Sequence, residues 1–301
     1  MILQRLPNMN YLQLITLAGS LLLSSFTSAF AITPNSVELE IAGMANNHAA
    51  QQRAEMVYDP ILNLVARAKA IDLAERRYFA HVDPDGYGPN KAVSLAGYEL
   101  PAWWGDANNL NYIESIAAGY SDASSAFDGW LNSAGHRRHL LGEEGFYARQ
   151  TRYGVGYVEV PGSPYQRYFV FISAPPNPAG DGQLEPYSEW LFSFYKPAEI
   201  DRDEDTTDTN NNGMARIIEF VLGFNPENQN RLPSPVFNEA EGRLEWNLPV
   251  RADLGSVQVE VQHSADLSTG SWSVEGVNRN GFVYSIPVAS RGFMRLQVSR
   301  E

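Results

Sequence analysis

Apolar side chains in the first half of the chain recur with the spacing of helices. Between residues 59 and 79 they occupy positions 61, 64, 65, 68 and 71, which lie on one face of a helix. Asp59 is suited to cap this helix, and Pro60 to occupy its first position. The helix should end near Phe79, because two prolines and two glycines follow in residues 81–90 and favour a loop.

Two further helices and then a β-hairpin are expected in the same half of the chain. The helices are predicted at residues 89–95 and, with Ser121 as the cap, through Leu131. Residues 153–160 and 166–173 are rich in β-branched and aromatic side chains, and the Pro-Gly-Ser-Pro sequence between them predicts the hairpin. Helices followed by strands are typical of an α+β fold built in layers.

The C-terminal part of the chain has the pattern of strands. After a short aromatic helix expected at residues 187–195, apolar and polar side chains alternate from residue 233 onward. The alternating segments are 244–248, 257–261, 282–288 and 293–298. A period of two predicts an antiparallel sheet with one covered face. We therefore expect a small all-β domain of the sandwich type, and we find no catalytic constellation in it.

These patterns divide the chain into five segments. They are a signal peptide (1–31), a first domain (32–176), a linker with a short helix (177–200), an acidic loop segment (201–226) and a small antiparallel β domain (230–301). The signal peptide is predicted from Arg5, the apolar run 12–26 and the Ala-Phe-Ala sequence at 29–31. A membrane anchor is the alternative, but the run is shorter than the ~20 residues of a spanning helix. We expect a mature protein without a transmembrane span that is secreted or held in the periplasm or cell envelope.

Composition narrows the classes of partner. The 301 residues contain no cysteine, so an exported chain of this kind must rely on core packing or a bound ion instead of disulfides. The formal net charge of −13 makes nucleic acid and anionic membranes poor partners. An extracellular ligand, a lipid or another protein remains as the expected partner.

One acidic segment has the register of an EF-hand calcium loop. The pattern D-x-[DN]-x-[DN]-G-x₅-E is matched at every defined position, beginning at Asp208 and ending at Glu219. Calcium prefers oxygen ligands from alternating loop positions, with a glycine at the sharp turn. The predicted ligands are the side chains of Asp208, Asn210, Asn212 and Glu219 and the backbone carbonyl of Met214. Two of these side chains are neutral, so we expect a weak, structural affinity suited to extracellular calcium.

Other interpretations of this acidic segment stay open. A run of like charge is also typical of a solvated loop. Arg216 at the ninth position of the loop would oppose an ion if it pointed inward. Asp201, Asp203 and Asp205 have the same alternate spacing but lack the glycine and the final carboxylate, so they are either additional ligands or part of a linker.

Residues 130–141 are predicted to form one wall of a cleft. Ser133 is suited to cap a short helix with its hydroxyl, which places His136 at about the third helical position. His81, just beyond the end of the first helix, and Glu114 are the best candidates for partners of His136. His139 is expected on the surface, and the large aromatic side chains are expected in the core; these are Tyr98, Tyr112 and Trp130.

The order and spacing of five motifs make residues 45–175 similar to a bacterial CAP domain, the superfamily of cysteine-rich secretory, antigen 5 and pathogenesis-related 1 proteins, also called the SCP domain. The motifs lie at 59–86, 96–98 (Ala-Gly-Tyr), 114–119 (Glu-Ser-Ile-Ala-Ala-Gly), 130–141 (Trp-x-x-Ser-x-Gly-His-Arg-x-x-Leu-Leu) and 154–157 (Gly-Val-Gly-Tyr). The resemblance implies an α-β-α sandwich with a cleft of histidines and acids that takes up a divalent metal in family members. The loop and β tail loosely resemble calcium repeats and small β domains at the C-termini of exported bacterial proteins.

The resemblance also implies roles for single residues. His81 matches the first family histidine, Glu114 the glutamate of a Gly-Glu-Asn motif, and His136 the histidine of Ser-x-x-His-Arg. In this chain Ile113 and Ser115 flank the glutamate. A second glutamate of eukaryotic members corresponds to Ser133, and their histidine on a later strand has no counterpart here.

Two classes of function are compatible with this cleft. The first is a secreted binding or structural module, in which His81, Glu114 and His136 could hold Zn²⁺ or another divalent metal weakly, as a three-ligand set with an open position. The second is a peptidase or esterase that uses a metal-activated water, or Ser133 as a nucleophile with His136 and Glu114. A capping serine has its hydroxyl occupied by the backbone, and no oxyanion-hole motif is visible. We therefore favour a module without enzyme activity, while a structural role set by the tail stays open.

Overall fold

The computed structural model describes residues 33–180, 184–288 and 292–300. The predicted signal peptide at 1–31 lies outside these residues. Within the described ranges, no helix has the length and apolar character needed to cross a membrane.

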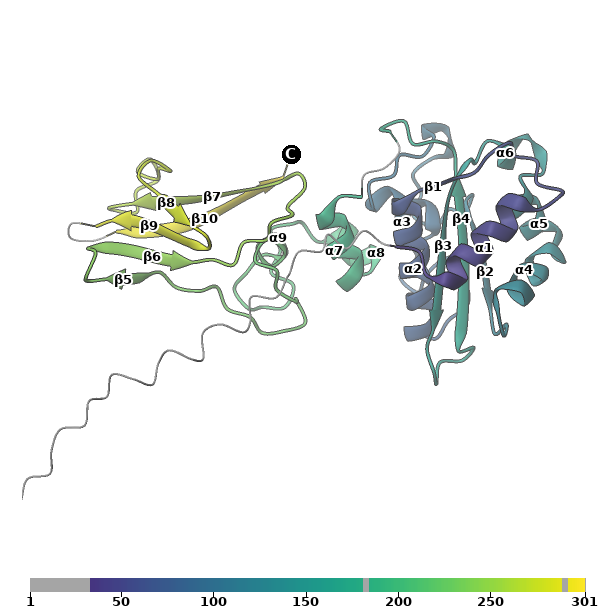
Figure 1. Cartoon of the computed structure of the whole chain (residues 1–301), viewed down its shortest axis with the longest axis horizontal. Coiled ribbons are helices and arrows are strands. Elements are labelled where there is room, and N and C mark those ends of the chain that lie inside the picture. Colours follow the sequence, from purple (N-terminus) through teal and green to yellow (C-terminus); the bar gives the residue numbers. More distant parts are fainter. Residues whose placement is uncertain (1–32, 181–183, 289–291, 301) are drawn as a thin grey trace, which may run out of the picture. The chain divides into compact units, whose positions relative to one another are not determined.

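The first domain consists of a four-stranded sheet with helices on both faces (Figure 1). Its helices are α1 (Ser36–Asn47), α2 (Pro60–Glu75), α3 (Pro89–Leu95), α4 (Ala123–Leu131), α5 (Ala134–Leu141) and α6 (Glu144–Ala148), with a 3₁₀ turn at Ala102–Trp104. Its strands are β1 (Val57–Tyr58), β2 (Glu114–Ala118), β3 (Arg152–Glu159) and β4 (Arg167–Ala174). The strand order is β1-β3-β4-β2; β1 runs parallel to β3, and the other pairs are antiparallel.

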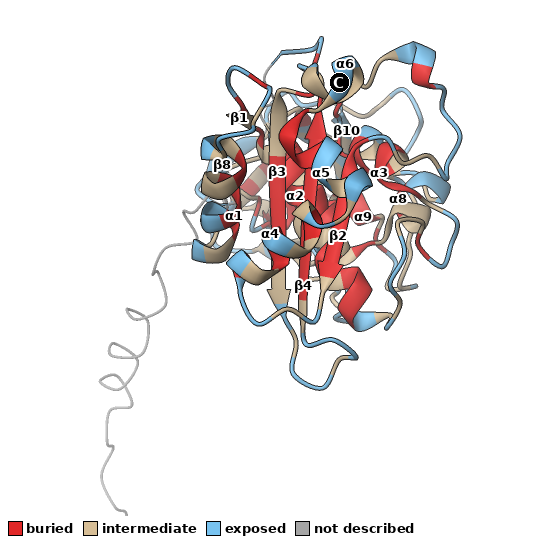
Figure 2. Cartoon of the chain, turned by 90° about the vertical axis from the view of Figure 1, so that its right-hand side faces the viewer, coloured by how far each residue is buried: buried red, intermediate tan, exposed pale blue. Residues whose placement is uncertain are grey.

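The central strand β4 shows why the domain has three layers. Successive side chains of a strand point to opposite faces of the sheet. Tyr168, Val170 and Ile172 belong to the core that includes α2 and α3, whereas Phe169 and Phe171 belong to the core that includes α1 and α4. Almost all of β4 is therefore buried, as Figure 2 shows. The α-β-α layering agrees with the α+β fold expected from the sequence.

Two glycines of β3 allow α2 to lie close to the sheet. A side-chain Cβ at Gly154 would overlap the backbone of Leu62 and Asn63, and one at Gly156 would overlap the backbone of Ala66. The Gly-Val-Gly sequence is thus a packing requirement, because no other residue leaves room for the helix backbone.

The predicted helices are close to those observed, with small shifts at their ends. Asp59 caps α2 by accepting the N–H groups of Ile61 and Leu62, as predicted, but the helix ends at Glu75 instead of near Phe79. The cap of α4 is Asp122, not Ser121. Asp122 forms a reciprocal pair of hydrogen bonds with Ser125 at the third helical position, which Ser121 is one residue too early to make.

The C-terminal half of the chain begins with short helices and ends in strands. The helices are α7 (Pro186–Phe194), α8 (Pro197–Arg202) and α9 (Arg216–Val221). The strands are β5 (Val236–Asn238), β6 (Arg243–Asn247), β7 (Val257–Ser264), β8 (Asn278–Asn280), β9 (Val283–Pro287) and β10 (Phe293–Arg300). They form two small sheets: β10 pairs with β7, and β5, β6, β9 and β8 form the other.

Candidate functional site

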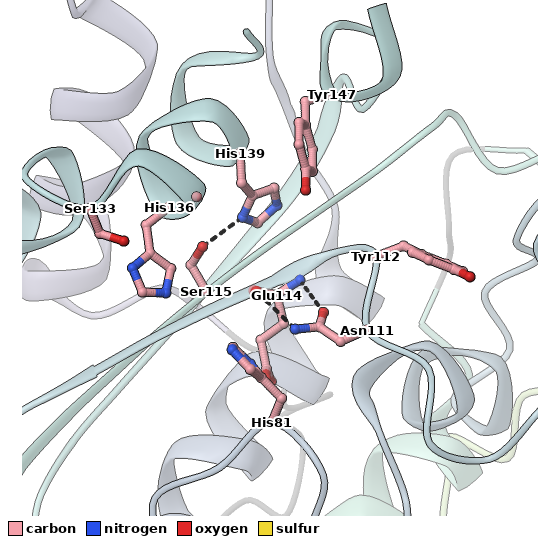
Figure 3. A pocket seen from close by; sticks show the side chains of 10 residues that line it. His81, Asn111, Tyr112, Glu114, Ser115, Ser133, His136, His139 and Tyr147 are labelled. Atoms are coloured by element: carbon pink, nitrogen blue, oxygen red, sulfur yellow. Dashed lines mark hydrogen bonds and ion pairs between the residues drawn. The ribbon is translucent and has the colours of Figure 1, made fainter. Parts of the chain in front are cut away.

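The four residues predicted for the cleft lie around one cavity of about 210 Å³. His81 precedes α3, Glu114 begins β2, and Ser133 and His136 belong to the start of α5. Figure 3 shows Ser133 and His136 on one side of the cavity and His81 on the other. The complete lining is His81, Asn111, Tyr112, Glu114, Ser115, Ser133, Gly135, His136, His139 and Tyr147.

His81 is held in place from both its backbone and its ring. Lys69 on α2 donates a hydrogen bond to the His81 carbonyl at 2.9 Å. The ring Nδ1 lies 2.8 Å from Oε1 of Glu114. The side chain of His81 is 37% exposed, whereas that of Glu114 is fully buried, so the imidazole covers the carboxylate from the solvent side.

Glu114 has one carboxylate oxygen that no protein group satisfies. Asn111 orients its backbone, since Oδ1 of Asn111 accepts the N–H of Glu114 at 3.0 Å and Nδ2 donates to its carbonyl. Oε1 is paired with His81. Oε2 is buried and has no hydrogen-bond partner among the described residues. Leaving a buried carboxylate oxygen unpaired is costly, so this atom is a strong acceptor for a donor or a cation brought by a ligand.

Ser133 occupies the N-cap of α5, and His136 is the third residue of the helix, as predicted. The Ser133 hydroxyl, however, makes no capping hydrogen bond, so the prediction that the backbone occupies it is wrong. Within the described residues, no hydrogen bond joins Ser133 to His136 or Glu114, so a serine nucleophile paired with its base is not formed here. Burial, followed by the nearby His81, lowers the pKa of His136, which favours a neutral ring.

His139 is buried, contrary to the prediction that it lies on the surface. It is 4% exposed. Nδ1 lies 2.8 Å from the Ser115 hydroxyl, and Nε2 lies 2.9 Å from the Ser173 hydroxyl. Ser173 donates to Gln150, so it accepts from Nε2–H, and Nδ1 then accepts from Ser115.

The surroundings of His139 keep its ring neutral. Burial, reinforced by the charge of Arg53, holds the pKa of His139 well below its ordinary value. Arg53 lies over the C-terminal end of α5 and donates to the carbonyls of His139 and Leu140. The sequence-based prediction failed because nothing in the local spacing shows that Arg53 and β4 cover this face of the helix.

Aromatic side chains divide between the core and the cavity. Tyr98 and Trp130 are buried, as expected. Tyr112 is 37% exposed and lines the cavity, so its assignment to the core was wrong. Tyr112 packs edge-on against Trp104, with 5.4 Å between ring centroids. Tyr147, which lines the same cavity, was missed because it comes from the short helix α6.

The ionisable groups of the cleft do not form a ready metal site. Among the described residues, no three histidine, aspartate or glutamate side chains lie close enough together to hold a metal ion. Glu114 is already paired with His81. As they lie in the structure, His81, Glu114 and His136 do not fit a three-ligand zinc centre, and zinc in the cleft remains a prediction.

Four of the predicted calcium ligands lie in the loop before α9, and the fifth, Glu219, lies in α9 itself. Gly213 has a φ of 87°, which suits the sharp turn required at that position. The loop shares no lining residue with the cleft cavity.

The cleft lies in a stretch of the chain that matches a known protein family. Residues 41–173 match the family described as the cysteine-rich secretory protein family, CAP. This stretch, less than half of the chain, is similar to a CAP domain. His81, Glu114, Ser133 and His136 all fall within it, whereas the loop at 208–219 lies beyond it.

Two Bacillus subtilis proteins are similar to parts of the chain. YkwD is 28% identical over 148 residues, which make up 48% of this chain and 52% of YkwD. The membrane protein YlbC is 33% identical over 103 residues, or 34% of this chain and 26% of YlbC. The chain therefore spans about half the length of the first relative and about a quarter of the second.

Two solved structures are similar to parts of the chain. An outer surface protein from Borrelia burgdorferi is 19% identical with a TM-score of 0.35, over 46% of this chain and 90% of that chain. An extracellular SCP-domain protein from Bacillus anthracis is 24% identical with a TM-score of 0.34, over 46% and 40% of the two chains.

Proposed function

We propose that the protein is an exported binding module whose CAP-domain cleft holds a polar, hydrogen-bond-donating group of its ligand without catalysing a reaction. The observation that carries the proposal is the unpartnered Oε2 of Glu114, a buried acceptor that lines the cavity. His81 and Asn111 hold this residue in place before any ligand arrives. A preorganised acceptor of this kind favours binding, because little further conformational entropy is lost when the ligand binds.

The cavity suits one end of a ligand better than a whole drug-sized molecule. Its volume of about 210 Å³ lies below the ~300–1,000 Å³ of typical small-molecule sites. Tyr112 contributes to the rim of the cavity, but its ring points away from Glu114 (Figure 3). An ammonium, hydroxyl or amide group of an extracellular ligand, a lipid or a protein fits the buried end.

Export rests on the N-terminal sequence. The apolar run and the Ala-Phe-Ala site predict a removed signal peptide, which would place the cleft outside the cytoplasm. The absence of cysteine is compatible with this location, because the CAP domain is held by two extensive apolar cores.

Binding can be tested with two small probes of opposite charge. Ethylammonium and acetate would be titrated against the mature protein while the ring signals of His81 and His136 are followed by NMR. Ethylammonium should shift these signals, and acetate should not. Glu114→Gln should abolish the shift, and Glu143→Gln, a matched change just beyond the end of α5 and outside the cavity lining, should keep it. Equal shifts in wild type and Glu114→Gln would refute the proposal.

A hydrolase is a second candidate because the Ser133 hydroxyl is free of the capping bond. Such an enzyme would use Ser133 as nucleophile and neutral His136 as base once a substrate brings them into contact. Labelling by a fluorophosphonate probe tests this directly. Labelling that disappears in both Ser133→Ala and His136→Ala would favour the hydrolase over the binding module.

A further inference from the structure

Side-chain oxygens of the loop between α8 and α9 accept hydrogen bonds from the backbone of the same loop. The carboxylate of Asp208 accepts the N–H groups of Asn212 at 3.1 Å and Gly213 at 2.8 Å. Oδ1 of Asn210 accepts the N–H of Asn212, and Oδ1 of Asn212 accepts that of Met214. Each of these oxygens has a second lone pair, which these contacts leave free for another partner.

Glu219 closes the loop from α9 and is the least satisfied group in it. It is 1% exposed. Its Oε1 accepts the side-chain amides of Asn210 at 2.9 Å and Asn212 at 2.8 Å. Its Oε2 is buried without a hydrogen-bond partner among the described residues. A carboxylate in this position requires a compensating positive charge or a proton.

Three aspartates that precede the loop are already paired with cations. Asp201 pairs with Lys91 at 3.0 Å, Asp203 with Arg202 at 3.0 Å, and Asp205 with Arg216 at 3.6 Å and Arg300 at 3.4 Å. No ion pair between described residues includes Asp208 or Glu219. Of the acids in this segment, Glu219 is the buried one that has no cation among the described residues.

Arg216, at the ninth loop position, does not block the loop. It is buried and points toward the segment before the loop, where it donates to the carbonyls of Glu199, Ile200 and Asp203. Its guanidinium therefore pairs with Asp205 and binds the preceding backbone carbonyls. It does not occupy the centre of the loop, so a cation could bind there.

We propose that the loop 208–219 binds one calcium ion through the side-chain oxygens of Asp208, Asn210, Asn212 and Glu219 and the carbonyl of Met214. Hard oxygen ligands from a flexible loop select Ca²⁺ over Zn²⁺, and the mixture of carboxylate, amide and carbonyl ligands is that of a calcium site. With two carboxylates in the set, we expect a dissociation constant of roughly 0.1–1 mM, in the range of extracellular calcium modules.

The ion would act as a structural clamp on α9. This helix buries Ile217, Phe220 and Val221 in the larger apolar core, and Met214 is buried beside them. Neutralising Glu219 at the polar side of the helix would therefore stabilise the packing on its apolar side. This role shares no residue with the cleft, so its failure would leave the proposed binding function untouched.

Thermal unfolding of the mature, full-length protein provides the test. Calcium chloride at about one hundred times the dissociation constant should raise the unfolding midpoint by roughly 5–10 °C over a chelator control. Magnesium chloride at the same concentration should raise it less, because Mg²⁺ gives up its water ligands reluctantly.

Glu219→Gln separates a calcium site from a generally acidic loop. In chelator this variant should unfold at the wild-type midpoint or above it, because a buried, uncompensated charge has been removed. Its calcium response should disappear. Asp201→Asn, a matched change in the same acidic segment, should keep the calcium response, because Asp201 is paired with Lys91.

Terbium luminescence gives a reading that does not depend on stability. The Tyr195 hydroxyl lies 3.0 Å from Oγ1 of Thr209 inside the loop, so tyrosine excitation should sensitise a bound lanthanide. Calcium should displace terbium, and Asp208→Asn should weaken its binding at least tenfold. The proposal is overturned if calcium leaves the wild-type midpoint unchanged, or if Glu219→Gln keeps both the calcium shift and the luminescence.

Discussion

Acid should destabilise the first domain through His139, because the ring is buried in its neutral form. Burial, with the Arg53 charge, places the pKa of His139 well below its ordinary value of 6.5. The unfolded chain therefore takes up a proton at a higher pH than the folded domain does. The stability contributed by the neutral ring is fully present above about pH 6.5 and is lost as the pH falls below that value.

The expected slope is large enough to measure. One proton bound only by the unfolded state costs about 1.4 kcal/mol of unfolding free energy per pH unit. His139 should therefore lower the stability progressively as the pH falls below about 6.5, for as long as the folded domain keeps the ring neutral, and a typical domain has only ~5–15 kcal/mol to lose. His136, whose pKa is also lowered by burial and by His81, adds to the upper part of this pH range.

Urea denaturation of the wild type, His139→Gln and Ser115→Ala at about pH 7, 6 and 5 tests this prediction. His139→Gln should lose about 1–3 kcal/mol at neutral pH, because its amide replaces the hydrogen bonds of the ring imperfectly. Its pH slope should be shallower than that of the wild type by about 1.4 kcal/mol per unit. Ser115→Ala keeps the imidazole, so it should lower the stability at every pH and keep the slope. If His139→Gln retains the full wild-type slope, the assignment of the titrating group is wrong.

Three further predictions concern the scaffold around the cleft. Gly154→Ala forces a methyl group into the backbone of α2 and should cost about 3 kcal/mol or more, measured by urea denaturation, whereas Gly135→Ala, with open space around it, should be nearly neutral. Asp59→Ala should cost about 1–2 kcal/mol, because the N-terminus of α2 loses its cap. Arg76→Met leaves the largely buried carboxylate of Asp72 without its bidentate partner and should cost about 3 kcal/mol; faster amide exchange in the loop around His81 would accompany it.

Local chemistry in the sequence was sufficient to place several elements. Asp59 and Pro60 define the start of α2, because capping and the fixed φ of proline act within one helical turn. The hairpin of β3 and β4 follows in the same way from two strand-forming runs and the turn between them. The motifs around His81, Glu114 and His136 also placed the three residues at one cavity, through their resemblance to a family rather than through any local rule.

Only the tertiary structure decided what surrounds each of these residues. Whether His139 is neutral depends on Arg53, Ser115 and Ser173, which come from distant parts of the chain. The free hydroxyl of Ser133 and the exposed ring of Tyr112 likewise depend on packing that no local spacing encodes.

In the C-terminal half, too, the sequence predicted the local elements and the tertiary structure decided their contacts. The alternating pattern predicted strands but could not tell which would pair, and they form two sheets because pairing is set by contacts between distant segments. The spacing of Asp208 and Glu219 was visible in the sequence, whereas the direction of the buried Arg216 side chain, toward the carbonyls of Glu199 and Asp203, was not. Burial and charge compensation depend on the whole fold, so the sequence determined which chemical groups are available and the tertiary structure decided which of them remain free to bind.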